Sequence, residues 1–376
     1  MKLAVAGESA AGERRVAVVP EVAKRLAAAG WQLVVQSGAG TEAAFTDADY
    51  ADAGAEIAPD VEACVAGAGV VVRVQAPSAE EAQRLPDGAV VLSFLQPPAS
   101  LAALRVLAKK RCSAFSFDLL PRISRAQSMD ALSSQATVSG YRAALTAATR
   151  IGRFFPMLMT AAGTVPPAKV LVMGAGVAGL QAIATSRRLG AVVRAYDVRA
   201  AAKEEAESLG ASFVDLGVSA EGAGGYAREL SAEELAQQQR ALADEVARAD
   251  AVITTAAVPG RRAPVLVTRA MVEAMAPGAV VVDMAADSGG NCECTEAGRD
   301  VVVSCTTVVG MANPPSGMPT HASALYARNV ANLLGLMGAE GTFAPDWDDE
   351  IVKGTCVLRD GEPVHAPTAE LLRGAT

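Results

Sequence analysis

Three glycines in one short turn are the clearest sign of chemistry in this sequence. Gly174, Gly176 and Gly179 form the pattern G-x-G-x-x-G between the strand-like run KVLVM (169–173) and an alanine-rich helical run. In that context the first glycine permits a tight turn, the second lets the backbone approach a pyrophosphate, and the third lets helix and strand pack closely. The helix N-terminus adds free N–H groups and a positive dipole end. The pattern predicts a dinucleotide-binding turn made by Gly174, Ala175, Gly176, Val177 and Gly179.

An acidic residue follows at the place where a dinucleotide presents its ribose. Asp197 ends the next strand-like run, VVRAYD (192–197), and Val198 comes directly after it. A carboxylate there accepts hydrogen bonds from both ribose hydroxyls and repels a 2′-phosphate, which favours NAD(H) over NADP(H). Arg199 leaves an alternative open, because an arginine can accommodate a 2′-phosphate. We interpret Arg199 as a solvated or adenine-side residue.

A polar cluster, RISRAQSMDALSSQ (122–135), stands out in a chain that is 51% hydrophobic. Gln127, Asp130 and Ser133 or Ser134 recur at three-residue spacing, so they share one face if the segment is helical. Arg122 lies just before them. Amide and hydroxyl groups on such a face match the donor and acceptor of a nicotinamide carboxamide, and Arg and Asp could form an orienting pair. A solvated helix face beside a domain junction explains the same residues equally well.

The run GVSAEGAGGYAREL (217–230) carries four glycines and one aromatic residue, Tyr226. Glycine-rich composition predicts mobility, and a single tyrosine on such a loop could close over a bound nucleotide and exclude water. An ordinary surface loop is the alternative.

Proton-handling groups are scarce. A dehydrogenase acting on an alcohol or amine needs a general base near its substrate, often His or Lys. The chain has 2 histidines, His321 and His365, and neither stands in an obvious catalytic motif. This scarcity suggests a hydride acceptor that releases no proton, such as a second nicotinamide.

Alternating strand-like and helix-like runs must position these residues. They predict an α/β fold of two Rossmann-like, doubly wound parallel-sheet domains, the first discontinuous in sequence. The first domain is expected at 1–135 plus 335–376, and the NAD(H)-binding domain at 136–334, with long linking helices at its boundaries. The expected strands are 2–7, 32–38, 70–74, 90–94 and 113–117, then 169–173, 192–197, 212–216, 251–256, 279–285 and 300–305.

Charge and composition exclude several classes of partner. The net charge of −8 and the absence of a basic run argue against nucleic acid. The longest uncharged stretch, 305–327, is broken by three prolines, so no membrane insertion is expected. Cys292 and Cys294 form one C-x-C with no second pair or nearby histidine, which predicts no metal site.

Taken together, the motifs resemble domain I, the NAD(H)-binding part of the alpha subunit, of proton-translocating NAD(P) transhydrogenases. The resemblance runs through essentially the whole chain in six ordered motifs. They are ERRVAVVPEVAKRL (13–26), RISRAQSMDALSSQA (122–136), GAGVAGLQAIATSRRLGAVVRAYDVR (174–199), GGYAREL (224–230), TTAAVPGRRAPVL (254–266) and VVVDMAADSGGNCE (280–293).

The resemblance implies roles for particular residues. The family's nicotinamide-site residues fall on Arg122, Gln127, Asp130 and Ser133, its mobile-loop tyrosine on Tyr226 and its ribose acid on Asp197. Cofactor contacts are also implied at Thr255, Ala256 and Pro259. In the family, NADH passes its hydride directly to NADP⁺ on a partner subunit, coupled to proton movement through a membrane-spanning subunit. A homodimer is implied, cytoplasmic and peripheral on the inner membrane through its partner subunits.

Alanine dehydrogenase resembles the chain more weakly at the chemistry. That family carries a Lys-Val-Lys-Glu-Pro run where this chain has RVQAP (73–77), and a catalytic histidine where this chain has SFLQPP (93–98). The segment AGESAAGERR (6–15) lacks the Pro-Lys-Glu pattern usual in both families. An amino-acid dehydrogenase and a non-catalytic NAD(H) sensor remain the alternative functions.

Overall fold

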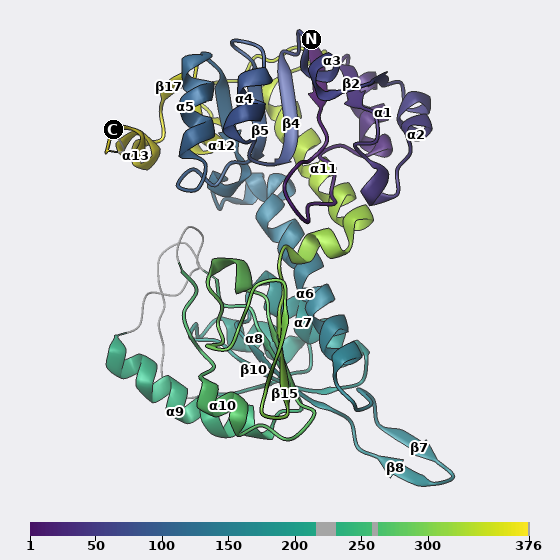
Figure 1. The fold of residues 1–376 in the computed structure, drawn as a ribbon, viewed down its shortest axis with the longest axis vertical. Helices are drawn as coiled ribbons and strands as arrows, with labels where there is room; N and C mark the ends of the chain where they lie inside the picture. The colour runs from purple at the N-terminus through teal and green to yellow at the C-terminus, as the bar shows by residue number, and fades with distance from the viewer. Residues whose placement is uncertain (216–230, 258–261, 375–376) are drawn as a thin grey trace. The chain divides into compact units, whose positions relative to one another are not determined.

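The computed structural model describes residues 1–215, 231–257 and 262–374, and the chain forms two compact units (Figure 1). The first unit comprises Met1–Gln135 and Pro315–Thr376, and the second comprises Ala136–Pro314. The chain returns to the first unit at Pro315, earlier than the predicted 335. The reason is that the helix α11 (Pro319–Met337) packs its apolar side chains into the core of the first unit.

The first unit is built on an eight-stranded sheet in the order β17-β16-β6-β5-β4-β1-β2-β3. Six strands are parallel, and β16 and β17 extend the β6 edge antiparallel. The strands are β1 (Lys2–Val5), β2 (Gln32–Gln36), β3 (Glu56–Ala58), β4 (Val70–Gln75), β5 (Val90–Phe94), β6 (Ser113–Ser116), β16 (Cys356–Arg359) and β17 (Glu362–Pro363).

Helices cover both faces of this sheet, which explains why its strands read as continuous apolar runs. Side chains of α1 and α11 join one core cluster with the sheet, and those of α3, α4 and α5 join the other. The helices are α1 (Pro20–Ala28), α2 (Asp47–Asp52), α3 (Val61–Val65), α4 (Ala79–Arg84), α5 (Leu101–Lys109), α11, α12 (Glu350–Thr355) and α13 (Ala366–Gly374), with the 3₁₀ turns η1 (Thr41–Ala43), η2 (Phe117–Leu119), η3 (Ser124–Met129) and η6 (Pro314–Gly317).

The second unit has a seven-stranded sheet in the order β11-β10-β9-β12-β13-β15-β14. Its strands are β9 (Lys169–Met173), β10 (Val192–Tyr196), β11 (Ser212–Phe213), β12 (Ala251–Thr254), β13 (Val280–Asp283), β14 (Asp300–Val303) and β15 (Thr306–Gly310). A separate hairpin is formed by β7 (Leu158–Thr160) and β8 (Gly163–Val165). The helices are α6 (Ala131–Arg150), which begins in the first unit, α7 (Val177–Arg188), α8 (Ala202–Ser208), α9 (Ala232–Arg248), α10 (Arg269–Glu273) and the 3₁₀ turn η5 (Ala286–Ser288).

The α/β fold with parallel-strand sheets is confirmed, with corrections at the edges. The strand predicted at 300–305 is a hairpin: β14 runs antiparallel to β15, which was not predicted. The run DVVVSCTTVVG contains no Gly or Pro until its end, and the chain turns where Ser304 adopts a positive φ of 54°. The short strands β3, β16 and β17 were also not predicted. Across the described ranges, no helix has both the length and the apolarity to span a bilayer.

Candidate functional site

The predicted dinucleotide turn lies where the strand order of the second sheet reverses. β9 is paired with β10 on one side and with β12 on the other. The chain leaves β9 through Gly174–Gly176 and enters α7 at Val177. Ligands of open α/β sheets bind beyond the carboxyl ends of the strands at this reversal. The turn therefore lies where the fold provides a site.

The three glycines have different surroundings. Gly174 has a φ of +98°, and an added Cβ would lie 2.6 Å from Thr255 Oγ1. A Cβ on Gly179 would lie 1.8 Å from the carbonyl oxygen of Gly174. A Cβ on Gly176 would meet only an Arg199 guanidinium nitrogen, at 4.0 Å. Packing thus requires Gly174 and Gly179, whereas Gly176 borders open space of the kind a pyrophosphate would need.

The carboxylate of Asp197 is held beside this turn by several donors. Its Oδ2 accepts the backbone N–H of Ala175 at 2.7 Å. The Arg199 backbone N–H and Nε donate to Oδ1 at 2.8 and 2.9 Å, and its Nη2 donates to Oδ2 at 2.8 Å. The hydrogen bond with Asp197 raises the pKa of Arg199. Arg199 is therefore paired with Asp197 at the turn, and its assignment as a solvated or adenine-side residue stays a prediction.

The carboxyl end of β12 is tied to the same turn. The Thr255 hydroxyl donates to the carbonyl of Gly174 at 3.0 Å. The carbonyl of Ala256 accepts the amide of Asn291 at 2.8 Å, and the same amide donates to Pro264 at 2.7 Å. Pro259 lies outside the described residues.

A buried aspartate, Asp283, organises the loop that carries Asn291. Its carboxylate accepts hydrogen bonds from Ala285 N, Asn291 N and Cys292 N at 2.9, 2.7 and 3.0 Å, and from Thr295 Oγ1 at 2.6 Å. Neither Asp283 nor Asn291 was singled out from the sequence. Their only signal was their place in the motif VVVDMAADSGGNCE, which does not reveal which groups the side chains hold.

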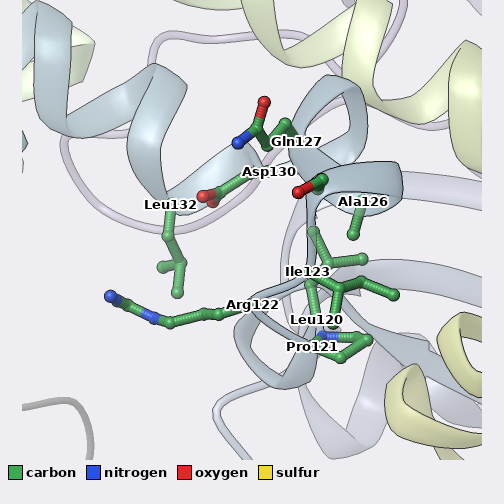
Figure 2. A pocket seen from close by; sticks show the side chains of 9 residues that line it. Leu120, Pro121, Arg122, Ile123, Ala126, Gln127, Asp130 and Leu132 are labelled. Carbon is green, nitrogen blue, oxygen red and sulfur yellow. The ribbon is translucent and has the colours of Figure 1, made fainter. Parts of the chain in front are cut away.

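The polar cluster forms a hollow of the first unit, of about 270 Å³, shown in Figure 2. Arg122, Asp130 and Leu132 project to the same side of it in this view. The residues that line it are Leu120, Pro121, Arg122, Ile123, Ser124, Ala126, Gln127, Asp130 and Leu132. The structure thus brings Arg122, Gln127 and Asp130 together. We call residues 122–134, where the sequence predicts nicotinamide contacts, the nicotinamide segment.

The nicotinamide segment is not the single helix that the spacing suggested. It forms η3, then breaks at Asp130, where φ is −73° and ψ is 86°, and continues as α6. Asp130 Oδ1 accepts the backbone N–H of Ser133 at 2.9 Å and Oδ2 accepts its hydroxyl at 2.5 Å. This is N-cap geometry, which typically stabilises a helix by ~1 kcal/mol. Asp130 therefore has a structural role beside any chemical one. Tyr226, the predicted loop aromatic, lies outside the described residues.

The first unit has its own buried charged cluster, which the sequence did not predict. Arg15 donates to Glu13 through Nε at 2.7 Å and Nη2 at 2.6 Å, and the Gln75 amide and the Ser316 hydroxyl donate to the same carboxylate at 2.8 and 2.5 Å. Burial raises the pKa of Glu13, but hydrogen bonds and charge from Arg15, with help from Ser316 and Gln75, outweigh it and lower the pKa to about 2.

The two histidines lie apart from the nicotinamide segment's hollow. His321 is exposed at the start of α11. His365 shares a 2.7 Å hydrogen bond with Thr368, and burial lowers its pKa. In the described part of the chain, no group of three or more His, Cys, Asp or Glu side chains is placed to hold a metal ion.

Two domain models match the chain. They are described as "Alanine dehydrogenase/PNT, N-terminal domain", which matches residues 4–139, and "Alanine dehydrogenase/PNT, C-terminal domain", which matches residues 143–366.

Individual relatives divide between the two enzymes of that description. The chain is 46% identical to an NAD(P) transhydrogenase subunit alpha chain of Rhodospirillum rubrum, over 97% of this chain and 98% of the relative. It is 32% identical to alanine dehydrogenase of Mycobacterium tuberculosis, over 88% of each. The crystal structure of transhydrogenase from Sinorhizobium meliloti matches with a TM-score of 0.86 and 42% identity, covering 98% of this chain and 100% of that one.

Proposed function

The chain belongs to the alanine dehydrogenase/PNT family, and we propose that it is the NAD(H)-binding alpha subunit of a proton-translocating NAD(P) transhydrogenase. In this function hydride moves directly between NADH on this chain and NADP⁺ on a partner subunit, coupled to proton translocation by a separate membrane domain. The higher identity to a transhydrogenase subunit than to an alanine dehydrogenase favours this member of the family.

The lining of the nicotinamide segment's hollow is the observation that carries the proposal. It contains a guanidinium, a carboxamide and a carboxylate, from Arg122, Gln127 and Asp130, but no histidine, lysine, tyrosine or cysteine among the described residues. Such groups can bind and orient a ring. Carbon-to-carbon hydride transfer releases no proton, so it needs no local general base, whereas oxidation of an amine does.

Each site residue then has a proposed role toward NADH, which supplies the hydride when bound. Gln127 and the Ser133 hydroxyl pair with the nicotinamide carboxamide, and Arg122 and Asp130 fix the orientation of the ring. Tyr226 is proposed to shield the site from water. The pyrophosphate binds against the turn and Asp197 binds the ribose. The proposed turn and flanking contacts are Gly174, Ala175, Gly176, Val177, Gly179, Val198, Arg199, Thr255, Ala256 and Pro259.

Three partners complete the proposal: an NADP(H)-binding subunit, a membrane-spanning subunit and a second copy of this chain. The protein would then act at the cytoplasmic side of the inner membrane through its partner subunits. The hairpin β7–β8 supports the homodimer, because Met157 and Met159 are 58% and 80% exposed. A two-stranded hairpin is marginally stable alone in water, and packing against a second copy would stabilise it.

A two-component assay tests the function. The purified protein is mixed with NADH and an NADP⁺ analogue whose reduced form absorbs at a distinct wavelength, with or without the cognate NADP(H)-binding subunit. Reduction of the analogue only when both proteins are present is the expected result. Reduction of NAD⁺ by L-alanine with this protein alone would instead establish the dehydrogenase, and NADH binding without any transfer would leave a sensor.

A further inference from the structure

Helix α11 holds the nicotinamide segment through one buried amide, that of Asn329. The side chain lies on the inner face of α11, and Asn329 is 6% exposed. Its Nδ2 donates to the carbonyl of Ser128 at 2.9 Å, and its Oδ1 accepts the hydroxyl of Ser134 at 2.8 Å. One amide therefore connects two points that lie on either side of Asp130 in the chain.

The positions of Ser128 and Ser134 matter because the nicotinamide segment passes from one helix to another between them. Ser128 belongs to η3 and Ser134 to the first turn of α6, and Asp130 leaves helical geometry at the junction. Gln127 lies before the junction and Ser133 after it. A change in the angle between η3 and α6 would move Gln127 and Ser133 relative to each other. The amide of Asn329 opposes that change.

Only a carboxamide satisfies both partners. The Ser128 carbonyl needs a hydrogen-bond donor, and the Ser134 hydroxyl donates to an acceptor. Asparagine supplies both the donor and the acceptor within one short side chain. Aspartate has the same shape but would place an oxygen against the Ser128 carbonyl. The Ser128 carbonyl would then keep only the donor of the partly exposed Asn332 and would face a second buried oxygen, which is unfavourable.

The two hydrogen bonds of the Asn329 amide are part of a larger buried network. The Gln135 amide donates to the Ser134 hydroxyl at 3.2 Å and to the Ala322 carbonyl at 3.0 Å, and Arg15 donates to Gln135 at 2.9 Å. Fully satisfied networks of this kind make a segment rigid. Asn332 donates to the same Ser128 carbonyl at 2.9 Å from a partly exposed position.

We propose that Asn329 is a positioning residue for hydride transfer, which orients Gln127 relative to Asp130 and Ser133 without touching the nicotinamide itself. The inference rests on the proposed function. It predicts an effect on the transfer step with little effect on NADH affinity, because the dinucleotide turn lies on the other unit of the chain.

The test compares Asn329→Asp with the matched variant Asn332→Asp, which brings the same change to the same carbonyl. NADH affinity is measured by NADH fluorescence, and single-turnover transfer to the NADP⁺ analogue is measured with the cognate NADP(H)-binding subunit. Misplacement by about 1 Å can cost ~100-fold in rate, so we expect Asn329→Asp to slow transfer at least ~10-fold with an NADH Kd within ~3-fold of wild type. Asn332→Asp should change each quantity by less than ~2-fold.

Ser134→Ala keeps the proposal testable if Asn329→Asp fails to fold. It removes the hydrogen bond from the Ser134 hydroxyl to Asn329, and we expect hydride transfer to slow by ~3-fold at unchanged NADH affinity. In the Asn329→Asp background its further loss should be smaller than in the wild type, since the two changes break the two bonds of one side chain that act together. Wild-type transfer in the Asn329→Asp and Ser134→Ala variants, or equal losses of affinity and rate, would overturn the inference. A wild-type protein without transfer would contradict the proposed function instead.

Discussion

The two units of this chain share one strand order, but the point where that order reverses is open in the second unit and occupied by a side chain in the first. In the first unit the order β3-β2-β1-β4-β5-β6 reverses between β1 and β4, and in the second β11-β10-β9-β12-β13-β15 reverses between β9 and β12. The second unit leaves space beside Gly176 at this point. The first unit fills it with its own carboxylate, that of Glu8.

Glu8 is held at the reversal point of the first unit by specific hydrogen bonds. Glu8 is buried and accepts the backbone N–H groups of Val74 at 2.6 Å and Gln75 at 3.2 Å, where the β4–β5 register is irregular. Burial raises the pKa of Glu8, although Arg73 and these two N–H groups oppose the shift. Protein N–H groups that could bind a ligand's anion are thus used internally.

The residue at the end of the second strand also differs. In the first unit the N–H of Gly7 donates to Gln36 at 2.9 Å, and in the second unit the N–H of Ala175 donates to Asp197 at 2.7 Å. The contact is the same, but an uncharged amide stands in place of the acid. Strand order therefore provides a position for a ligand, and the loops decide whether the position is open and what charge it presents.

The largest expected effect comes from disrupting the packing of the glycine turn at the open reversal point. Gly179→Ala places a Cβ 1.8 Å from the Gly174 carbonyl, so we expect loss of NADH binding and destabilisation above ~4 kcal/mol. A control in the turn after β1 of the first unit, Gly7→Ala, meets only the flexible Gln36 side chain at 3.3 Å and should be tolerated. NADH fluorescence and thermal melts measure both variants. If Gly179→Ala and Gly7→Ala were tolerated equally well, the proposed difference between the two units would be contradicted.

Acid should weaken the first unit through Glu13. Its folded pKa of about 2 lies below the ordinary value of 4.5, so its contribution is present above about pH 5 and is lost as the pH falls toward 2. The shift corresponds to a contribution on the order of 3 kcal/mol. Glu13→Gln should flatten the pH dependence of the unfolding free energy in this range, measured by urea titrations. The exposed Glu42→Gln should not, and a flat wild-type profile would contradict the assignment.

Asp130→Asn should separate orientation from affinity. Asparagine also caps helices well, so stability should fall by less than ~1 kcal/mol, whereas removal of the charge should slow hydride transfer by ~10–100-fold. NADH affinity should stay within ~3-fold of wild type. The two-component assay and NADH fluorescence provide the two readouts. Equal losses in both would make Asp130 a simple binding residue.

The smallest expected effect comes from making the second unit resemble the first. Asp197→Gln should lower NADH affinity by ~10-fold, or about 1.4 kcal/mol, and reduce the preference for NADH over NADPH. The substitution also releases Arg199 from its carboxylate, which leaves its guanidinium available to a 2′-phosphate. Competitive titration with NADPH measures the change. Unaltered preference would mean that the acid does not select the cofactor.

The strand, turn and helix around the glycine turn could be predicted because the pattern is local. The glycines fall within six residues of one another, and close contacts leave no room for a side chain at Gly174 or Gly179. The sequence did not predict the roles of Glu8 or Asn329, because their partners lie far along the chain at Val74 and Ser128. Glu13 pairs with the nearby Arg15, but its further partner Ser316 is equally distant. No periodicity or spacing encodes such pairs.

The nicotinamide segment could be predicted only in part. Its composition marked it, and the structure does gather Arg122, Gln127 and Asp130. The condition that the segment is one continuous helix is not met, because Asp130 caps a new helix through Ser133. An aspartate followed by a serine three residues later is a recognisable N-terminal signal, so this break could have been predicted.

The exposed Met157, directly before β7, and Met159, within β7, carry a practical consequence for handling the purified protein. Oxidation to the sulfoxide would turn Met157 and Met159 from flexible apolar side chains into polar ones. An unassembled chain stored under air would then lose the apolar character of that surface while its cofactor turn stayed intact. Preparations should accordingly be compared by intact mass before any difference in self-association is assigned to the sequence.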